Sequence, residues 1–498
     1  MASFIFLFFF ISVCVTHLSL SSSEIVLPLT HSLSETQFNH THQLLKSSSV
    51  RSTTRFRSHY HHGHLHHRRQ ISLPLSPGSD YTLSCSLGSD PVQTISLYMD
   101  TGSDLVWFPC APFECILCEG KYDSSTAATT PNVSSSVSVP CNSPVCSAVH
   151  SSLPSSDLCA VSRCPLESIE ISECSSFACP SFYYAYADGS LIARLYRDSI
   201  SIPMSSPSLH LKNFTFGCAH TALGEPIGIA GFGRGTLSLP AQLSNLSPHL
   251  VNSFSYCLIS HSFDVQRIHR PSPLILGRYS LDDKKGKQSV NGEEEFQYTS
   301  MLNNPKYKYF YCVGLEAVSV GGSRIPTPER LKKVNRNGDG GMVVDSGTTF
   351  TMLPARLYEL VVSEFDRRVG RIYERARETE DQTGLGLCYY TDNSVDKAIP
   401  LKVPKVAFHF VGNASVVLPT RNYFFGFTNG GDGVGRKRKV GCLMLMNGGD
   451  DAESGGPMAT LGNYQQQGFE VIYDLEKGRV GFARKQCATL WDSLNRGR

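Results

Sequence analysis

The segments ISLYMDTGS at residues 95–103 and GMVVDSGT at residues 341–348 are two versions of one pattern. Each is a short apolar run that ends in Asp, a small hydroxyl residue, Gly and a second hydroxyl residue. An apolar-apolar-Gly element follows later in each half, at residues 229–231 and 460–462. One Asp-Thr-Gly or Asp-Ser-Gly alone would be an ordinary turn sequence. The repetition predicts two related halves, each of which brings one aspartate to a site where the halves meet.

Two carboxyl groups that face each other, Asp100 and Asp345, can hydrolyse a peptide bond while they share one proton. The ionised member takes a proton from water, and the protonated member polarises the scissile carbonyl group. The rest of each tetrad supports the pair: the glycine lets backbone N–H groups approach the carboxylate. The first hydroxyl bonds across to the other half, and the second bonds the outer carboxylate oxygen. The supporting residues are Thr101, Gly102, Ser103, Ser346, Gly347 and Thr348.

A chain of 498 residues exceeds the usual size of one hydrophobic core, so we expect two lobes. Hydrophobic residues make up 41% and charged residues 18%, a globular balance, and the net charge of +2 indicates no polyanionic partner such as a nucleic acid. From residue 71 onward, short strand-like runs alternate with Gly, Pro, Ser and Asn, while residues 354–370 are the clearest helix. The sequence therefore predicts a mainly β chain with an N-terminal lobe over 71–265 and a C-terminal lobe over 266–498.

The first 70 residues have the composition of targeting and processing segments. Residues 4–15 are an apolar run followed by small polar residues, which predicts a signal peptide over 1–22. A membrane anchor is the alternative, but the run falls short of the ~20 apolar residues that cross a bilayer. Residues 23–70 are rich in Ser and His and predict a removable pro-segment, cut near Arg68 and Arg69, rather than a folded domain. Its histidines would gain charge as an exported protein meets acid, although a metal-binding tail is also conceivable.

Seventeen cysteines support export. Setting aside Cys14 leaves sixteen, an even number, and many of them are clustered, which favours a disulfide framework in an oxidising compartment. Cys115 and Cys118 form a CxxC, a spacing that zinc and redox sites also use. Because no His or second CxxC lies at zinc spacing nearby, we expect no metal. Sequons predict N-linked glycans at Asn132, Asn213, Asn245 and Asn413.

Residues from about 80 to 487 resemble the pepsin-like aspartic peptidases, in particular the cysteine-rich, nepenthesin-like branch found in plants. The motifs that carry the resemblance are DTGSDLVWFPC at 100–110, YAYADGS at 184–190, AGFGRGTLSLPAQL at 230–243, VVDSGTTFTML at 343–353 and LGNYQQQGFEVIYDLEKGRVGFA at 461–483. The resemblance implies a bilobal fold of two β-barrel-like lobes with a cleft between them. It also implies that Asp100 and Asp345 are the catalytic dyad and that no cofactor is needed.

The family has a mobile hairpin, the flap, that closes over the substrate. By resemblance its tyrosine is Tyr186, with Asp188 and Gly189 in the turn. Trp107 stands at the spacing of the tryptophan that bonds this tyrosine, although without the surrounding motifs both aromatics would be taken for core residues. Ala187 replaces the usual glycine of the flap, which puts the flexibility of the hairpin or its clearance over the substrate in doubt.

The resemblance alone implies the disulfides Cys388–Cys442 and Cys257–Cys487. Cys85 and Cys312 lie in strand-like segments where the family is not expected to have cysteines, so they form an additional bridge or remain free. A cysteine-rich insertion at residues 159–179 precedes the flap and should modify the rim of the cleft.

The expected function is that of a secreted aspartic endopeptidase, a monomer that cleaves proteins or peptides at acidic pH. We expect no membrane attachment after signal removal. The expected localisation is the apoplast or cell wall, with the vacuole as an alternative. A non-catalytic inhibitor on the same scaffold, similar to plant xylanase inhibitors, is the main competing class. A structural cell-wall glycoprotein would leave the repeated tetrads unexplained. The basic run at residues 436–439 is expected to be a solvated loop, although a processing site or a site for anionic polymer would also fit.

Overall fold

The computed structural model describes the chain in segments separated by gaps. The described residues are 25–31, 41–60, 81–88, 91–116, 130–186, 189–202, 209–223, 228–246, 250, 252–260, 271–278, 296–391, 402–429, 438–449 and 456–495. The expected signal peptide, the histidine-rich run and the expected lobe boundary near residue 265 lie outside them. Within the described part of the chain, no helix is both long enough and apolar enough to cross a membrane.

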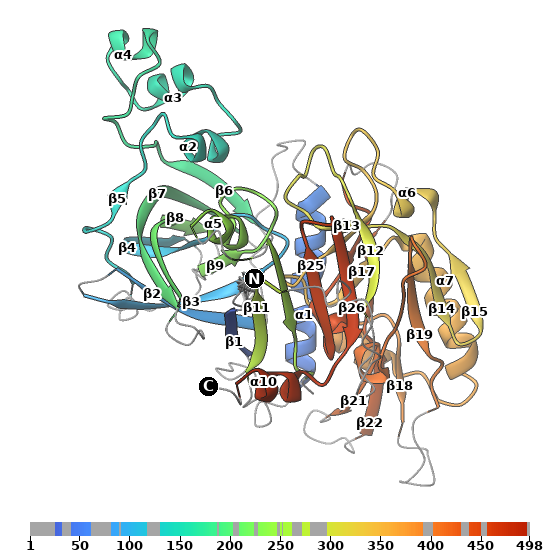
Figure 1. Ribbon diagram of the computed structural model, residues 1–498. Helices are drawn as coiled ribbons and strands as arrows, with labels where there is room; N and C mark the ends of the chain where they lie inside the picture. Colours follow the sequence, from blue (N-terminus) through green and yellow to red (C-terminus); the bar gives the residue numbers. More distant parts are fainter. Residues whose placement is uncertain are drawn as a thin grey trace, which may run out of the picture.

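The N-terminal lobe is a mainly antiparallel β structure (Figure 1). In β3, every second residue from Ile95 through Leu97 to Met99 is buried, as the period of a strand requires, and the strand ends at Asp100. Its strands are β2 (Tyr81–Leu87), β3 (Gln93–Asp100), β4 (Trp107–Ile116), β5 (Val137–Ser138), β6 (Phe182–Tyr186), β7 (Gly189–Ile202), β8 (Leu209–Leu223) and β9 (Gly228–Gly231). Its helices are α2 (Pro144–Val149), α3 (Ser155–Val161), α4 (Leu166–Glu170) and α5 (Leu239–Leu246).

The C-terminal lobe is also mainly β, with shorter strands. Helix α7 (Ala355–Val369) begins after Pro354, close to the bounds that the sequence predicts, and buries Leu357, Val361 and Phe365 on one face. The strands are β13 (Cys312–Val313), β14 (Leu315–Val320), β15 (Ser323–Pro326), β16 (Met342–Val344), β17 (Thr351–Leu353), β18 (Cys388–Tyr390), β19 (Val406–Phe410), β20 (Ser415–Val417), β21 (Phe424–Asn429), β22 (Arg438–Leu443), β23 (Leu445–Asn447) and β24 (Ala459–Leu461). The other helices are α6 (Glu329–Lys332), α8 (Arg377–Thr383), the 3-10 turn η5 (Thr420–Asn422), α9 (Asn463–Gln466) and α10 (Cys487–Asn495).

A sheet of six antiparallel strands joins the two lobes. Its order is β1-β11-β10-β25-β26-β12. The strands not yet placed are β1 (Ile25–His31), β10 (Ser253–Cys257), β11 (Ser272–Leu276), β12 (Gln297–Leu302), β25 (Phe469–Asp474) and β26 (Arg479–Arg484). Because β10 and β25 are neighbours, the sheet connects strands from the two halves of the sequence. The mainly β, two-lobed architecture that the sequence predicts is confirmed (Figure 1).

The repeated apolar-apolar-Gly elements position the loop after each aspartate. β9 lies parallel to β3, and β24 lies parallel to β16, so the two halves use the same crossing of strands. A Cβ atom on Gly231 would come within 2.5 Å of the backbone carbon of Asp104, and one on Gly462 within 2.6 Å of the backbone carbon of Phe350. Only glycine permits these approaches, which explains why the element occurs twice in the sequence.

The amino-terminal segment folds onto both lobes. β1 pairs antiparallel with β11 and contacts β2, and helix α1 (Thr41–Tyr60) lies between the lobes in Figure 1. Leu45 and Phe56 of α1 are buried in a cluster with Phe350 and Tyr464 of the C-terminal lobe. The sequence predicts an unfolded pro-segment here, whereas the described part of it forms a strand and a helix that pack against the two lobes.

Candidate active site

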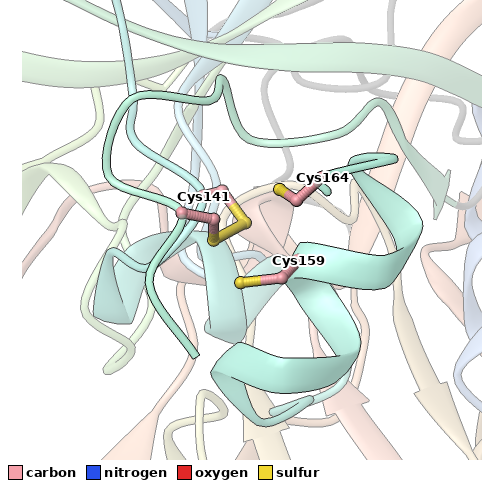
Figure 2. A group of neighbouring side chains, drawn as sticks. Cys141, Cys159 and Cys164 are labelled. Atoms are coloured by element: carbon pink, nitrogen blue, oxygen red, sulfur yellow. A yellow bond between two sulfur atoms is a disulfide. The ribbon is translucent and has the colours of Figure 1, made fainter. Parts of the chain in front are cut away.

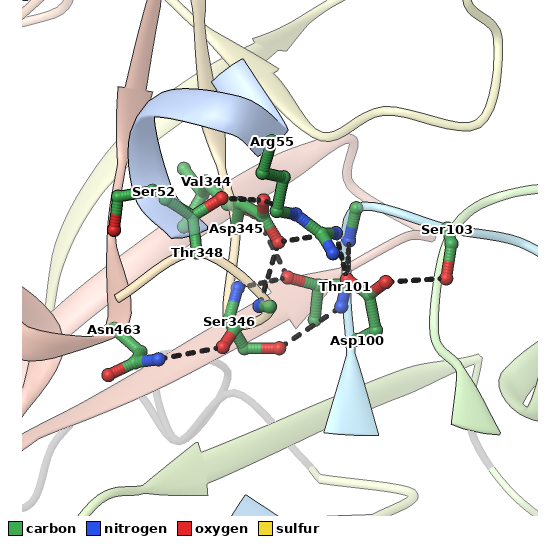
Figure 3. Close-up of polar contacts among 12 residues, drawn as sticks. Ser52, Arg55, Asp100, Thr101, Ser103, Val344, Asp345, Ser346, Thr348 and Asn463 are labelled. Atoms are coloured by element: carbon green, nitrogen blue, oxygen red, sulfur yellow. Dashed lines mark hydrogen bonds and ion pairs between the residues drawn. The ribbon is translucent and has the colours of Figure 1, made fainter. Parts of the chain in front are cut away.

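Asp100 and Asp345 lie next to each other between the lobes (Figure 3). Asp100 ends β3 and Asp345 follows β16, and the two residues are 1% and 0% exposed. One guanidinium group, that of Arg55 in α1, contacts both carboxylates. Its Nη2 atom lies 2.5 Å from Asp100 Oδ1 and 3.4 Å from Asp345 Oδ1, and its Nε atom donates to Asp345 Oδ2 at 2.9 Å. The structure therefore brings together the two carboxylates that the sequence pairs.

Each carboxylate has matching supports from its own tetrad. The backbone N–H of Gly102 donates to Asp100 Oδ1 at 2.9 Å, and that of Gly347 donates to Asp345 Oδ1 at 2.8 Å. The other oxygen of each carboxylate accepts a hydroxyl group, from Ser103 Oγ at 2.7 Å in the first half and from Thr348 Oγ1 at 2.5 Å in the second. These hydrogen bonds hold each carboxylate in one orientation.

Two hydroxyl residues lock the tetrads together. The N–H of Ser346 donates to Thr101 Oγ1 at 2.8 Å, and the N–H of Thr101 donates to Ser346 Oγ at 3.0 Å. Each hydroxyl then donates to a backbone carbonyl of the opposite half, Thr101 to Val344 at 3.1 Å and Ser346 to Met99 at 3.2 Å. The reciprocal pattern holds the two loops against each other and so keeps the carboxylates close.

Replacing Thr101 by alanine should therefore lower the stability of the interface between the tetrads. The change leaves a buried N–H and a buried carbonyl without their hydroxyl partner, which typically costs about 1–3 kcal/mol. Thr101→Ser is the matched control, since it keeps the hydroxyl and removes one methyl group. Urea unfolding of both variants measures the difference. Equal free energies of unfolding for the alanine and serine variants would contradict the role of the hydroxyl.

Residues 81–278 match the family model described as xylanase inhibitor N-terminal, and residues 310–484 match the one described as xylanase inhibitor C-terminal. The chain is 58% identical over 440 residues to a probable aspartyl protease of Arabidopsis thaliana, with 85% of each chain covered. It is 31% identical over 414 residues to aspartic proteinase nepenthesin-1 of Nepenthes gracilis, with 82% of this chain and 78% of the relative covered. The chain belongs to the plant nepenthesin-like family of aspartic proteases.

Solved structures share the fold of this nepenthesin-like chain. The crystal structure of edgp has a TM-score of 0.56 at 18% identity, and the match covers 82% of this chain and 92% of that one. Basic 7S globulin from soybean has a TM-score of 0.55 at 17% identity, covering 94% of this chain and 99% of that one. At such low identities the likeness concerns the fold alone.

No pattern in the sequence of the nepenthesin-like chain singles out Arg55. It is one of several cations in the segment before residue 70, and only the placement of α1 brings it to the dyad. Burial lowers the pKa of Arg55, but the charges of Asp100 and Asp345 outweigh this effect and raise the pKa above its ordinary value. The guanidinium group is therefore a permanent cation that occupies the space between the two carboxylates.

Asp104 is a further carboxyl group beside the dyad loop. The N–H of Gly235 donates to its Oδ1 at 2.7 Å, and a Cβ atom on Gly233 would come within 2.4 Å of the same oxygen. Burial raises the pKa of the Asp104 carboxyl to about 6, although the hydrogen bond from Gly235 acts in the opposite direction. Asp104 lies in the motif DTGSD and Gly235 in the motif AGFGRG. Both motifs can be found in the sequence, but the contact between these two residues forms only in the folded chain.

The raised pKa of Asp104 predicts a pH-dependent stability. In the unfolded chain the carboxyl titrates near 3.8, so between pH 4 and 6 the folded state binds more protons than the unfolded state. The free energy of unfolding therefore falls as the pH rises through this window, by up to roughly 3 kcal/mol. Asp104→Asn keeps an oxygen for the Gly235 N–H but does not titrate, so its melting temperature should fall less between pH 4 and 6. Identical pH profiles for the variant and the wild type would refute this assignment.

The expected flap is only partly within the described residues. Tyr186 ends β6 and pairs with Gly189 of β7, which is the start of a hairpin, but the side chain of Tyr186 and the whole of Asp188 lie outside the description. Trp107 opens β4 and is 1% exposed, in the same cluster as Phe182 and Leu191. The role of Tyr186 and Trp107 in closing over a substrate stays a prediction.

The disulfides include both pairs that the resemblance implies, Cys257–Cys487 and Cys388–Cys442. Cys85 and Cys312 are buried and form no bridge. Cys115 is disulfide-bonded, and Cys118 lies outside the described residues. The other described bridges are Cys110–Cys218, Cys141–Cys174 and Cys146–Cys179.

Two surface predictions have different outcomes. The four sequon asparagines within the described residues are all exposed, as a glycan acceptor must be, and glycosylation itself stays a prediction.

The basic run at 436–439 is predicted to be a solvated loop, but Arg438 and Lys439 begin β22. The guanidinium carbon of Arg438 lies 3.4 Å from the centre of the Tyr390 ring, and this stacking gives the side chain a structural partner. Residues 436 and 437 lie outside the described part.

Proposed function

We propose that the chain is an aspartic endopeptidase that hydrolyses peptide bonds of proteins at acidic pH. The observation that carries the proposal is that two carboxylates with equivalent hydrogen-bond partners converge from two stretches of backbone far apart in the sequence. A non-catalytic binding protein has no need for this symmetry. Retention of both aspartates together with all six supporting residues therefore favours hydrolysis over binding alone.

The position of the Arg55 guanidinium group indicates where the reacting water would be held. Its Nη2 atom is within 3.4 Å of one oxygen from each aspartate, so a water molecule of similar size would contact both carboxylates there. One carboxylate would take a proton from this water, and the protonated partner would polarise the scissile carbonyl and later supply a proton to the leaving nitrogen. The reaction needs one proton on the pair, so activity is expected to fall when rising pH ionises both carboxyl groups.

The chain that still carries residues 23–70 would be a latent precursor. Arg55 occupies the water position, and α1 covers both aspartates, which are almost inaccessible to solvent. Removal of residues 23–70 after export would uncover the site, and a cut near Arg68 and Arg69 fits this role. Export to the apoplast, the cell wall or the vacuole, and action as a monomer on extended protein or peptide substrates, belong to the same proposal.

The alternative is a non-catalytic inhibitor or binding protein on the same scaffold. It is favoured by one observation, the description of both matching family models as parts of a xylanase inhibitor. The two functions make opposite demands on the dyad, because inhibition of another enzyme through a surface loop does not require buried, paired aspartates. The same purified protein can be tested for both.

The decisive experiment uses the secreted chain after acid processing, with its new amino terminus determined by sequencing. It should cleave a denatured protein at acidic pH, and pepstatin should abolish the cleavage. Inhibition of a fungal or bacterial xylanase is measured on the same preparation. Xylanase inhibition without any pepstatin-sensitive cleavage would replace the peptidase by the inhibitor.

A further inference from the structure

In the structure the cysteine-rich insertion expected at residues 159–179 begins earlier, because Cys141 and Cys146 are bridged to its end. The whole insertion, residues 141–179, projects from the N-terminal lobe and contains helices α2, α3 and α4 (Figure 1). Two disulfides close its base, Cys141–Cys174 and Cys146–Cys179, and each joins the start of the insertion to its end. They leave the middle of the insertion, which contains α3 and α4, without a covalent tie of its own among the described bridges.

The middle of the insertion has little apolar core to hold it. Helices α3 and α4 have only seven and five residues, far fewer than a helix needs to be stable by itself. Three of its apolar side chains are exposed to solvent: Val161, Leu166 and Ile171 are 54%, 73% and 72% exposed. Leu158 is buried instead against the cysteines of the insertion. Small segments of this kind are usually held by covalent bridges rather than by apolar burial.

Two thiols meet inside this segment (Figure 2). Cys159 lies on α3 and is 0% exposed, and Cys164 follows the helix and is 8% exposed. The chain turns back between them at Arg163, whose φ of 59° is left-handed, and the N–H of Cys164 donates to the carbonyl of Cys159 at 3.0 Å. Their sulfur atoms and those of Cys141 and Cys174 all lie within 4.8 Å of one another.

We propose that Cys159 and Cys164 form a third disulfide of the insertion in the exported protein. The proposal takes the oxidising compartment from the proposed export but does not depend on peptidase activity. The oxidant is an external disulfide, that of a thiol oxidoreductase or of oxidised glutathione. The Cys159 thiolate attacks one sulfur of it and displaces a thiolate, and the Cys164 thiolate then attacks Cys159 Sγ and displaces the second. Two electrons and two protons pass from the cysteine pair to the external disulfide, which leaves as two thiols.

The neighbouring disulfide Cys141–Cys174 argues against two alternatives for Cys159 and Cys164, a zinc site and a free pair of thiols. In a disulfide, Cys141 and Cys174 offer no thiolates, so only two thiols remain where a structural zinc site uses four ligands. A dithiol this close to a disulfide can also exchange with it, since a thiolate of Cys159 would attack Cys141 or Cys174 and open the base of the insertion. Pairing Cys159 with Cys164 removes this nucleophile and leaves the base intact.

The sequence around the pair allows a direct test on the secreted full-length chain. The protein is unfolded in N-ethylmaleimide without reductant, then cut with trypsin after Arg163 and with a protease that cleaves after Asp157 and Glu167. The expected product is LCAVSR (158–163) joined to CPLE (164–167) by a disulfide, with neither cysteine alkylated. Cys85 and Cys312 serve as the internal control, because both are buried without a bridge and should be alkylated on unfolding.

Three results would overturn the proposal. The first is alkylation of both Cys159 and Cys164 to the same extent as Cys85. The second is a cross-link from either residue to Cys141 or Cys174. The third is one zinc ion per chain in the purified protein, measured by plasma mass spectrometry, that is lost when both residues are changed. The double variant Cys159→Ser/Cys164→Ser adds a functional readout, since limited proteolysis should cut residues 155–172 faster than in Cys85→Ser or the wild type.

Discussion

Replacing Arg55 by alanine is expected to expose the dyad in the precursor before the amino-terminal segment is removed. The guanidinium group makes three contacts with the two aspartates, and all three side chains are almost fully buried. Breaking a buried ion pair by removing one partner typically costs roughly 3–5 kcal/mol, because the remaining charge is left without compensation. Here two carboxylates would be left facing each other. The equilibrium between the covered and the open site should therefore shift by on the order of a hundredfold or more.

The measurement is the binding of pepstatin to the intact precursor, because it reports access to the dyad without requiring turnover. The Arg55→Ala precursor should bind the inhibitor where the wild-type precursor does not, and mass spectrometry should show that the chain is uncut. Lys46→Ala is the matched control. The Lys46 variant removes another cation of α1. The Nζ atom of Lys46 donates to the backbone carbonyl of Asp381 at 3.1 Å and not to either aspartate of the dyad. Equal binding by the two variants would mean that loosening of the helix, and not the ion pair, controls access.

Arg55→Lys separates charge from shape. Lysine keeps the positive charge but offers a single ammonium group in place of the planar fork that reaches both carboxylates. We expect a precursor that binds pepstatin more weakly than the alanine variant and more strongly than the wild type. A lysine variant that matches the wild type would show that the charge alone is sufficient.

The contacts around the dyad could be predicted because they follow from local sequence. In each tetrad the glycine N–H and the second hydroxyl lie two and three residues after the aspartate, so the turn itself delivers them to the carboxylate. The bonds between Thr101 and Ser346 follow from the same repeat, since two equivalent loops that meet face to face present equivalent groups. The sequence repeat thus contains both the chemistry and the symmetry of the site.

The residues that the sequence does not reveal are those placed by distant packing. Arg55 reaches the dyad because Leu45 and Phe56 pack α1 against the C-terminal lobe. No periodicity in the sequence of α1 predicts this packing. The Asp104–Gly235 contact likewise joins two motifs whose distance cannot be read from the chain. For the same reason the sequence leaves the disulfide connectivity open, since Cys110 pairs with Cys218 rather than with a cysteine of its own cluster.

Replacing both catalytic candidates, as Asp100→Asn/Asp345→Asn, is expected to abolish cleavage by the processed protein. Asparagine has nearly the same shape and keeps an oxygen that can accept the N–H of Gly102 or Gly347, so the loops should still fold. It can neither take a proton from water nor give one to the leaving nitrogen. Loss of a general acid or base usually lowers the rate by about 10²–10⁴-fold, and here both functions are lost together.

The comparison requires a variant with the same chemical change at a site outside the dyad. Asp157→Asn provides it, because Asp157 is exposed on α3 of the insertion. Its kcat/KM on a denatured protein should equal that of the wild type, while the double variant should fall by at least about a thousandfold and keep its thermal unfolding transition. Each single variant should be nearly as impaired as the double one, because the two carboxyl groups act as one acid–base unit and neither works alone. Cleavage that persists in the double variant at acidic pH would mean that other residues carry the hydrolysis.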